Sequence, residues 1–441
     1  MATTDFNAGA GTGGLQLPPV VAPPAPRQPA RQRAGGLNRL EVVPEPELRP
    51  AHWRPLRIAM IGQKGVPATF GGIEHHVEEI GARLAARGHD VTVYCRSSYG
   101  SNREAEYRGM RLCHLRTVGS KHLDAIAHSA LSTVSAMAGR VDVVHYHALG
   151  PGLVAPLPKY LSGARVVLTV HGLDNERAKW GRAAKAVLGT AHWMSARVPD
   201  ETVVVSRTLA DHYEDMGTRR VTHVPNGVEP VAPRPADVIT TEFGLRPGSY
   251  LLFVGRLVPE KAPDLLIRAF SHVRTRRRLV ITGGSSFTDG YVAQLRKMAE
   301  PDPRVLFTGY AYGDRLTELY SNAAAFVLPS HLEGLPLTLL EAASYGVPIV
   351  ASDIAPHLEV LGSEEPGRRL FPSGDEQALA GAIRRSLDDR SEETAGAVRL
   401  RDEILRRYQW DEVTRHLEEI YLRAVDGDPA VGTSLGEVQA L

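Results

Sequence analysis

The stretch AAAFVLPSHLEGLPLTLLEAASYGVPIVAS, residues Ala323–Ser352, carries the clearest structural pattern in this chain. It predicts an apolar strand at Ala323–Leu328, then a loop, a short helix and a second apolar strand that begins at Val347–Ala351. Pro336 stands where a first helical residue belongs, and Gly346 stands where a left-handed residue would end the helix. The stretch is therefore a strand–loop–helix–strand unit.

Two carboxylates of this unit are candidates for ligand binding. Glu333 lies in the loop and Glu341 lies inside the helix, among apolar residues. A carboxylate in such surroundings needs hydrogen-bond donors, which the hydroxyl groups of a sugar or ribose supply. The amides of Gly334–Thr338, at the helix start, suit a phosphate or sugar oxygen. Alternatively, Glu333 is a helix-terminal charge and Glu341 reaches solvent; these residues alone leave both interpretations open.

The rest of the chain repeats the same alternation of strands and helices. A length of 441 residues, with 43% hydrophobic and 23% charged residues, is typical of a soluble protein with two domains. Repeated β-α units predict parallel sheets with ligands at the carboxyl ends of the strands. The expected strands are Arg57–Ile61, Asp90–Tyr94, Val141–His145, Val166–Val170, Thr202–Val205, Tyr250–Val254, Arg278–Thr282, Val305–Phe307, Ala324–Leu328 and Pro348–Ala351.

The expected fold class is α/β, with two doubly wound, Rossmann-like domains that face a central cleft. We expect these domains at residues 51–230 and 231–405. A helix at 406–424, within a periodic segment at Glu403–Leu422, should pack back on the first domain. Residues 1–50 contain nine prolines and predict a disordered tail, and residues 425–441 predict a second tail.

Composition restricts the location and the partners. Two cysteines and no apolar run of about 20 residues favour a reducing, cytoplasmic compartment without a membrane span. Lys and Arg outnumber Asp and Glu by 19 to 11 over residues 51–200, whereas the acidic residues lead by 35 to 27 over 201–441. No basic run is interleaved with aromatic residues, so we expect no nucleic-acid partner. The basic first half suggests that this half faces something anionic, such as the inner membrane face.

Two loops are candidates for holding a diphosphate. The loop Gly62–Gly72 lacks the G-x-G-x-x-G spacing, and no acidic residue ends the second strand, so a dehydrogenase is disfavoured. Gly71 and Gly72 still allow close approach of the backbone to a ligand, although a plain tight turn is the alternative. In the second half, Arg256 follows a strand and Lys261 opens the next helix. Two cations at this point suit a pyrophosphate leaving group.

Histidines follow two strands of the first half. His145, His147 and His171 superficially suggest a metal site, but no nearby carboxylate completes it, so we expect no metal. A neutral His171 is expected to hydrogen-bond a sugar hydroxyl, and His145 is expected to be structural. The segment Lys179–Arg197 is a basic amphipathic helix that either packs on the core or lies on an anionic membrane.

Taken together, these motifs resemble the family 4 glycosyltransferases, which are retaining enzymes of the GT-B fold. The resemblance spans about Arg57 to Tyr421 and rests on motifs in preserved order, namely Gly71-Gly72-Ile73-Glu74, Thr169-Val170-His171-Gly172, Pro225-Asn226-Gly227-Val228, Gly255-Arg256-Leu257 with Lys261, and Glu333-x₇-Glu341. The first loop further resembles bacterial transferases of rhamnosyl or galactosyl type that assemble cell-surface polysaccharides.

The resemblance implies a nucleotide-diphosphate sugar as donor and no cofactor. It implies that Arg256 and Lys261 hold the diphosphate in place of a divalent cation, that Glu333 lies beside the donor sugar and that Glu341 binds the ribose. The other residues that we expect at the donor are His171, Gly71, Gly72, Asn226, Gly284, Tyr310, Gly334, Leu335, Leu337 and Thr338. The acceptor is expected to be a glycan or a lipid-linked molecule.

The expected mechanism is attack on the face that the leaving group occupies, since no second carboxylate is evident as a nucleophile. The departing phosphate would accept the proton of the acceptor, and the two cations would stabilise the developing charge. A nucleotide-sugar epimerase and a non-catalytic nucleotide-sugar-binding protein remain as alternatives. The donor sugar, the base and the acceptor cannot be read from these residues.

Overall fold

The fold was analysed in a computed structural model that describes residues 53–69, 71–99, 103–116, 124–173, 182–286 and 288–427. The tail expected at 1–50 lies outside the described residues, as do residues 179–181 at the start of the amphipathic segment and residues 428–441 of the tail expected at 425–441. The first residues of that second tail, Val425 and Asp426, belong instead to the last helix of the chain. Both sheets belong to one compact unit that spans Ala51–Leu441. No helix in the described part of the chain is long and apolar enough to cross a membrane.

The first sheet has eight strands in the order β3-β4-β2-β1-β5-β6-β7-β8, and all neighbours are parallel except β3 and β4. Its strands are β1 (Arg57–Ile61), β2 (Asp90–Arg96), β3 (Glu106–Tyr107), β4 (Met110–Leu115), β5 (Val143–His147), β6 (Arg165–Val170), β7 (Glu201–Val204) and β8 (Val221–His223). Its helices are α1 (Gly72–Ala86), α2 (Asp124–Ala138), α3 (Pro156–Leu161), α4 (Arg182–Ser195) and α5 (Arg207–Asp215).

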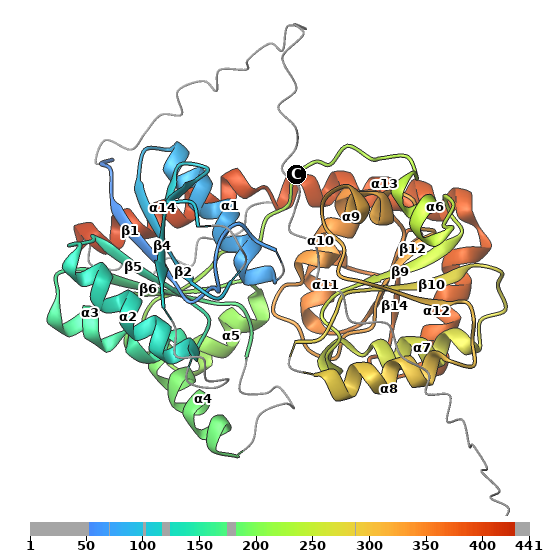
Figure 1. Cartoon of the computed structure of the whole chain (residues 1–441), viewed down its shortest axis with the longest axis horizontal. Helices are drawn as coiled ribbons and strands as arrows, with labels where there is room; N and C mark the ends of the chain where they lie inside the picture. The colour runs from blue at the N-terminus through green and yellow to red at the C-terminus, as the bar shows by residue number, and fades with distance from the viewer. Residues whose placement is uncertain are drawn as a thin grey trace, which may run out of the picture. The chain divides into compact units, whose positions relative to one another are not determined.

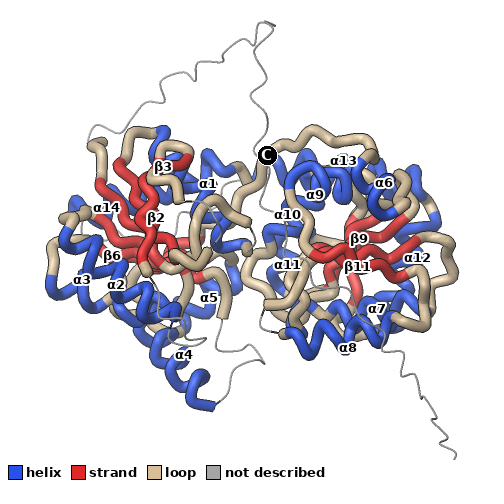
Figure 2. Tube along the Cα trace, viewed as in Figure 1, coloured by secondary structure: helices blue, strands red, loops and turns tan. Residues whose placement is uncertain are grey.

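The second sheet has six parallel strands in the order β11-β10-β9-β12-β13-β14. They are β9 (Tyr250–Val254), β10 (Arg278–Thr282), β11 (Val305–Gly309), β12 (Ala325–Leu328), β13 (Ile349–Ser352) and β14 (Arg368–Phe371). The helices of this half are α6 (Val238–Phe243), α7 (Pro263–Ser271), α8 (Asp289–Ala299), α9 (Gly313–Ser321), α10 (Leu337–Ser344), α11 (Ala355–Leu361), α12 (Glu376–Asp388) and α13 (Arg390–Arg407). Helices cover both sheets (Figure 1, Figure 2). The predicted fold class, two Rossmann-like α/β domains with parallel sheets, is confirmed.

The stretch Ala323–Ser352 contains β12, α10 and β13. The four residues of β12 and the four of β13 are fully buried, and the two strands pair in parallel. Gly346 has a φ of 68°, so the predicted left-handed residue after the helix is confirmed. Pro336 is extended and precedes the helix instead of opening it. Similarly, Pro259–Lys261 forms a separate 3₁₀ turn, and α7 begins only at Pro263.

The long helix expected at the C-terminal end is two helices, α13 and α14 (Trp410–Asp426). Gln409 is extended and forms a bridge with Val228, whose amide donates to the carbonyl of Tyr408 over 2.6 Å. This long-range pairing interrupts the helical pattern. Beyond the break, α14 packs against α1 and contacts β6, both in the first half.

Candidate functional site

The loop between β12 and α10 holds a buried ion pair. Lys261 Nζ lies 2.6 Å from Glu333 Oε1, and the hydroxyl of Ser330 donates to the same oxygen over 2.7 Å. The two charged side chains are 12% and 10% exposed. Burial opposes ionisation of Glu333, but the charge of Lys261 and these hydrogen bonds hold its pKa below the usual value. Glu333 is therefore a carboxylate held in its charged form.

The start of α10 carries unused donors beside this pair. No side chain caps the helix, so its first amides keep their donors available. The Oγ1 atom of Thr338 is buried and is without a hydrogen-bond partner among the described residues. An ideal Cβ on Gly334 would lie only 2.0 Å from the carbonyl oxygen of His171. This glycine therefore lets the loop of the second half touch the end of β6 in the first half.

Glu341 differs from Glu333 because it forms no ion pair within the described part of the chain, although the charge of Lys261 acts on it. Its Oε2 accepts a hydrogen bond from the hydroxyl of Tyr320 over 3.0 Å. Burial raises the pKa of Glu341, against the opposing effects of nearby charges and of Tyr320. A cavity of about 250 Å³ opens here, and its lining includes His75, Gly227, Tyr320, Leu337, Glu341 and Trp410.

The cation expected after β9 is close to a further lysine that sequence reasoning missed. Burial lowers the pKa of Lys64, and the charges of Arg96 and Arg256 lower it further, against the effect of Glu74. Arg256 also lies near Tyr310, whose hydroxyl donates to Ser285 O over 2.8 Å. Lys64 belongs to the first loop and Arg256 to the second half, so cations of both halves act on each other here.

Three of the glycines expected at the donor lie where the packing or the backbone conformation favours glycine. An ideal Cβ on Gly284 would lie 2.4 Å from the ring of Tyr310, which therefore stacks directly against the backbone after β10. Gly72 opens α1, and its Cβ position is 3.3 Å from Leu337 Cδ1. Gly71 has a φ of 104°, and the carboxylate of Glu74 folds back to accept the amide of Lys64 over 3.0 Å. The first loop is thus fixed close to the start of α10.

Asn226 connects the two halves through both ends of its amide. Its Nδ2 donates to the carbonyl of Leu335 over 2.8 Å, and its Oδ1 lies 2.9 Å from His76 Nδ1. Asn226 is 4% exposed and Leu335 is also 4% exposed. These hydrogen bonds join α1 to the loop before α10. Contact of Asn226 and Leu335 with the donor stays a prediction.

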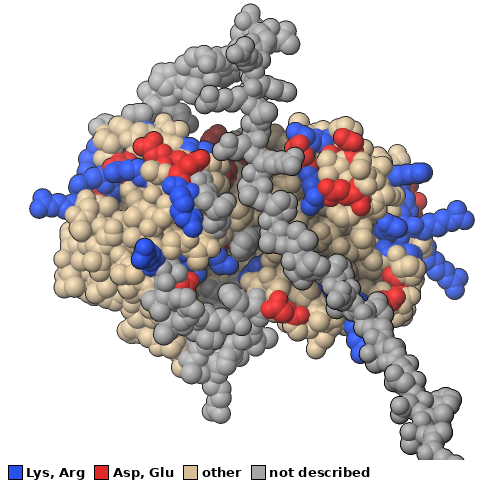
Figure 3. Space-filling view, viewed as in Figure 1, with Lys and Arg blue, Asp and Glu red and all other residues tan. Residues whose placement is uncertain are grey.

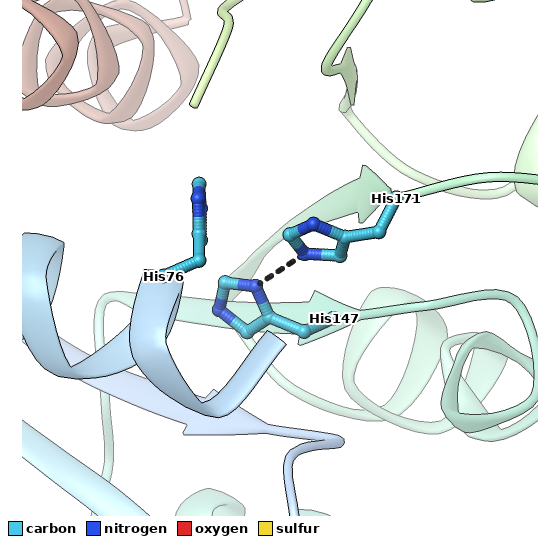
Figure 4. A group of neighbouring side chains, drawn as sticks. All are labelled: His76, His147 and His171. Carbon is cyan, nitrogen blue, oxygen red and sulfur yellow. Dashed lines mark hydrogen bonds between the residues drawn. The ribbon is translucent and has the colours of Figure 1, made fainter. Parts of the chain in front are cut away.

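The histidines occupy somewhat different places from those expected. His145 lies within β5, as expected, whereas His147 is the last residue of this strand and does not lie beyond it. His145 has both ring nitrogens occupied, by Tyr421 Oη at 2.6 Å and Thr169 Oγ1 at 2.7 Å, which fits the expected structural role. His171 directly follows β6. Figure 4 shows His76 of α1 above His147 and His171. The group of three histidines therefore contains His76, whereas the sequence had grouped His145 with His147 and His171.

The residues that sequence reasoning missed carried weak signals. His76 follows the Gly71-Gly72 motif, and nothing in that stretch of sequence indicates that its ring lies at the ends of two strands. Lys64 lies in the loop Gly62–Gly72, where the sequence analysis considered only the glycines. Both follow from the same fact, that β1 and β5 are neighbours in the sheet and so bring their carboxyl ends together.

Two family models match the chain, one on each half. Residues 70–231 match the model described as Glycosyltransferase Family 4, and residues 248–389 match the model described as Glycosyl transferases group 1. A D-inositol 3-phosphate glycosyltransferase of Acidothermus cellulolyticus is 30% identical over 422 residues, which cover 85% of this chain and 92% of that protein. A glycogen synthase of Mycobacterium tuberculosis is 28% identical, with 85% and 96% covered.

Solved structures show the same fold. Sucrose-phosphate synthase of Thermosynechococcus elongatus superposes with a TM-score of 0.75 at 20% identity, covering 85% of this chain and all of that one. Anabaena HepE, solved with UDP and glucose, superposes with a TM-score of 0.70 at 17% identity over 83% of this chain and 99% of that one. The two family models, the relative at 30% identity and the shared architecture establish that this chain belongs to the GT-B glycosyltransferases of family 4.

Proposed function

We propose that the protein transfers a sugar from a nucleotide-diphosphate sugar to a hydroxyl group of a glycan or lipid-linked acceptor, with retention and without a metal ion. The observation that carries this proposal is the buried Lys261–Glu333 pair beside the uncapped start of α10, where the carbonyl of His171 touches Gly334. The site thus offers cations, a fixed carboxylate and free amides at one point. The Anabaena neighbour, solved with UDP-glucose, supports this class of donor.

The proposed roles follow from charge and position. Arg256 and Lys261 neutralise the diphosphate, and the buried hydroxyl of Thr338 with the first amides of α10 binds phosphate or sugar oxygens. Glu333, kept ionised, faces positive charge that develops on the sugar. Glu341 accepts a ribose hydroxyl. His171 donates to or accepts from a hydroxyl of the sugar.

In the proposed reaction the acceptor oxygen attacks the anomeric carbon on the face that the leaving group vacates. The bond between that carbon and the diphosphate oxygen breaks, and the leaving phosphate takes the proton of the acceptor hydroxyl. Arg256 and Lys261, both of the second half, stabilise the charge on the leaving group. No divalent cation is needed, because two side-chain cations already supply the countercharge.

A panel of nucleotide sugars tests the proposal. We expect one donor to raise the melting temperature and to be hydrolysed slowly without acceptor, with EDTA leaving both effects unchanged. NMR of the product with acceptor should show the anomeric configuration of the donor. Isomerised donor would instead support an epimerase, and binding without any turnover would support a binding protein. Binding of no nucleotide sugar would refute the donor class.

The acceptor is proposed to be lipid-linked and used in cell-surface polysaccharide synthesis at the inner membrane face, with rhamnosyl- or galactosyl-type transfer as the first chemistry to test. Large apolar side chains are exposed on three helices of the first half, namely Leu131 and Val134 on α2, Tyr160 and Leu161 on α3, and Val187 and Trp193 on α4. The area over α2 and α3 carries few charged side chains (Figure 3). This apolar surface supports peripheral membrane contact.

Vesicle sedimentation tests the membrane contact. The variant Val134→Asp, at a side chain that is 60% exposed, should reduce binding to anionic vesicles. The matched control Val398→Asp lies on α13 of the second half, where the side chain is 37% exposed, and should bind as the unaltered protein does. Equal binding by both variants, or no binding by the unaltered protein, would contradict this surface assignment.

A further inference from the structure

Three histidines from different elements point one ring nitrogen each toward a common position. His76 comes from α1, His147 ends β5 and His171 follows β6 (Figure 4). These nitrogens all lie within 4.8 Å of one another, and one pair, His147 Nδ1 and His171 Nε2, forms a hydrogen bond over 3.4 Å. Tetrahedral zinc with Zn–N bonds of about 2.05 Å requires N···N separations of about 3.4 Å. One pair of ligand atoms therefore already has the spacing of a metal site.

The ring nitrogens are also in a state that suits a metal. The amide nitrogen of Asn226 donates to Leu335, so its oxygen faces His76 and accepts a hydrogen bond from Nδ1–H. The tautomer of His76 thus keeps the lone pair on Nε2, and Asn226 orients the ring as an outer-shell partner would. The other nitrogen of His147, Nε2, is buried without a hydrogen-bond partner in the described chain.

The ligand atoms that this cluster offers are imidazole nitrogens. Among the described residues the group contains no carboxylate, which favours Zn²⁺ and related transition metals over Mg²⁺ or Ca²⁺. His145 is excluded because Tyr421 and Thr169 occupy both of its nitrogens.

We propose that His76, His147 and His171 form an inhibitory site for Zn²⁺ or a similar divalent transition metal ion. His76 and His147 are 3% and 0% exposed, whereas His171 is partly exposed, so the fourth ligand position opens on the His171 side. A bound ion occupies the nitrogen that His171 would otherwise offer to the donor sugar. The binding site stands on the geometry alone, while the inhibition rests on the proposed function.

Metal binding is measured directly, without turnover. Chelator-treated full-length protein is titrated with Co²⁺, and we expect the intense visible absorption of tetrahedral cobalt at one equivalent, displaced by Zn²⁺. His147→Gln and His171→Gln should each abolish the band and weaken zinc binding by more than the roughly 10- to 100-fold caused by loss of an outer-shell partner. If circular dichroism shows that His147→Gln does not fold, the partly exposed His171→Gln decides the matter.

The matched control is a second histidine pair of the same chain. His192 Nε2 and His212 Nε2 lie 3.0 Å apart on α4 and α5, so His192→Gln removes a comparable pair away from the cluster. This control should bind cobalt as the unaltered protein does. No stoichiometric binding by the unaltered protein, or equal loss in the control, would overturn the site.

Inhibition is then measured against the donor found in the nucleotide-sugar screen. We expect Zn²⁺ to raise the KM for the donor with little change in kcat, and Mg²⁺ to have no such effect. Zinc binding without any rise in KM would overturn the inhibitory role. Failure of the donor screen would refute the proposed function and leave the cobalt titration to decide the metal site separately.

Discussion

One buried carboxylate of α14, Glu418, adds polar contacts with the first half to the apolar packing of this helix. Its Oε1 accepts hydrogen bonds from Trp53 Nε1 and from His89 Nε2, both over 2.8 Å, and its Oε2 accepts one from Arg87 over 2.7 Å. Glu418 is 3% exposed. His89 Nδ1 accepts the amide of Leu56 over 3.0 Å, so the proton on Nε2 is free to be donated to the carboxylate. We therefore expect Glu418→Gln to loosen this helix.

The magnitude follows from the pKa. Burial alone would raise the pKa of Glu418, but the donors from His89, Trp53 and Arg87 lower it from 4.5 to about 2. At 1.36 kcal/mol per pH unit, this difference corresponds to about 3 kcal/mol of stability. Because the pKa in the folded state is the lower one, this contribution is complete above pH 4.5 and is lost as the pH falls through about 2.

Urea unfolding at several pH values measures the effect. We expect Glu418→Gln to lower the free energy of unfolding by about 3 kcal/mol at pH 7, with a difference that narrows below pH 4.5. Hydrogen exchange should locate the loss in α1 and α14. The neighbouring control Glu419→Gln, whose side chain is 48% exposed and pairs with Arg415, should cost less than about 1 kcal/mol. Equal effects of the two variants, or a difference that widens in acid, would refute the reasoning.

Two further predictions concern the candidate site. Lys261→Met leaves Glu333 buried without its cation, so the free energy of unfolding at pH 7 should fall by about 3–5 kcal/mol, and denaturation of the double variant with Glu333→Gln should show partial recovery. Gly334→Ala places a Cβ only 2.0 Å from the carbonyl oxygen of His171. Moving the loop away from this clash should cost about 1–3 kcal/mol. If the bound state bears this cost, donor titration should show roughly 5- to 150-fold weaker binding. The control Gly290→Ala, with open space around its Cβ position, should bind donor normally.

The strands of the second sheet were largely predictable because their apolar runs are continuous and buried. Tyr250–Val254 and Arg278–Thr282 have the predicted bounds. By contrast, β3, β4, β8 and β14 were missed. Of these, β3, β8 and β14 are edge strands, and β4, which lies next to an edge, mixes basic and apolar residues over Met110–Leu115. An edge strand is buried on fewer sides, and its sequence carries a correspondingly weaker signal.

Two features that the sequence did not predict, the break between α13 and α14 and the ion pair of Lys261, arise from contacts between residues far apart in the chain. The break between α13 and α14 comes from a bridge between Gln409 and Val228, which are far apart in the chain. The ion pair of Lys261 with Glu333 was likewise not predicted as a contact, although both residues were candidates. Residue types and their strand-end positions were readable, whereas the pairing of side chains required the packed structure.

The two carboxylates of the β12–α10 unit illustrate this limit, since the pKa of one glutamate is lowered and that of the other is raised. Lys261 keeps the pKa of Glu333 low, whereas burial raises that of Glu341, eight residues later. Such separation of two similar groups assigns them different tasks. With the donor in the proposed position, we expect Glu333 to supply a fixed negative charge beside the sugar and Glu341 to accept a ribose hydroxyl. The proposed division of roles therefore follows from the pairing of Lys261 with Glu333 and not with Glu341.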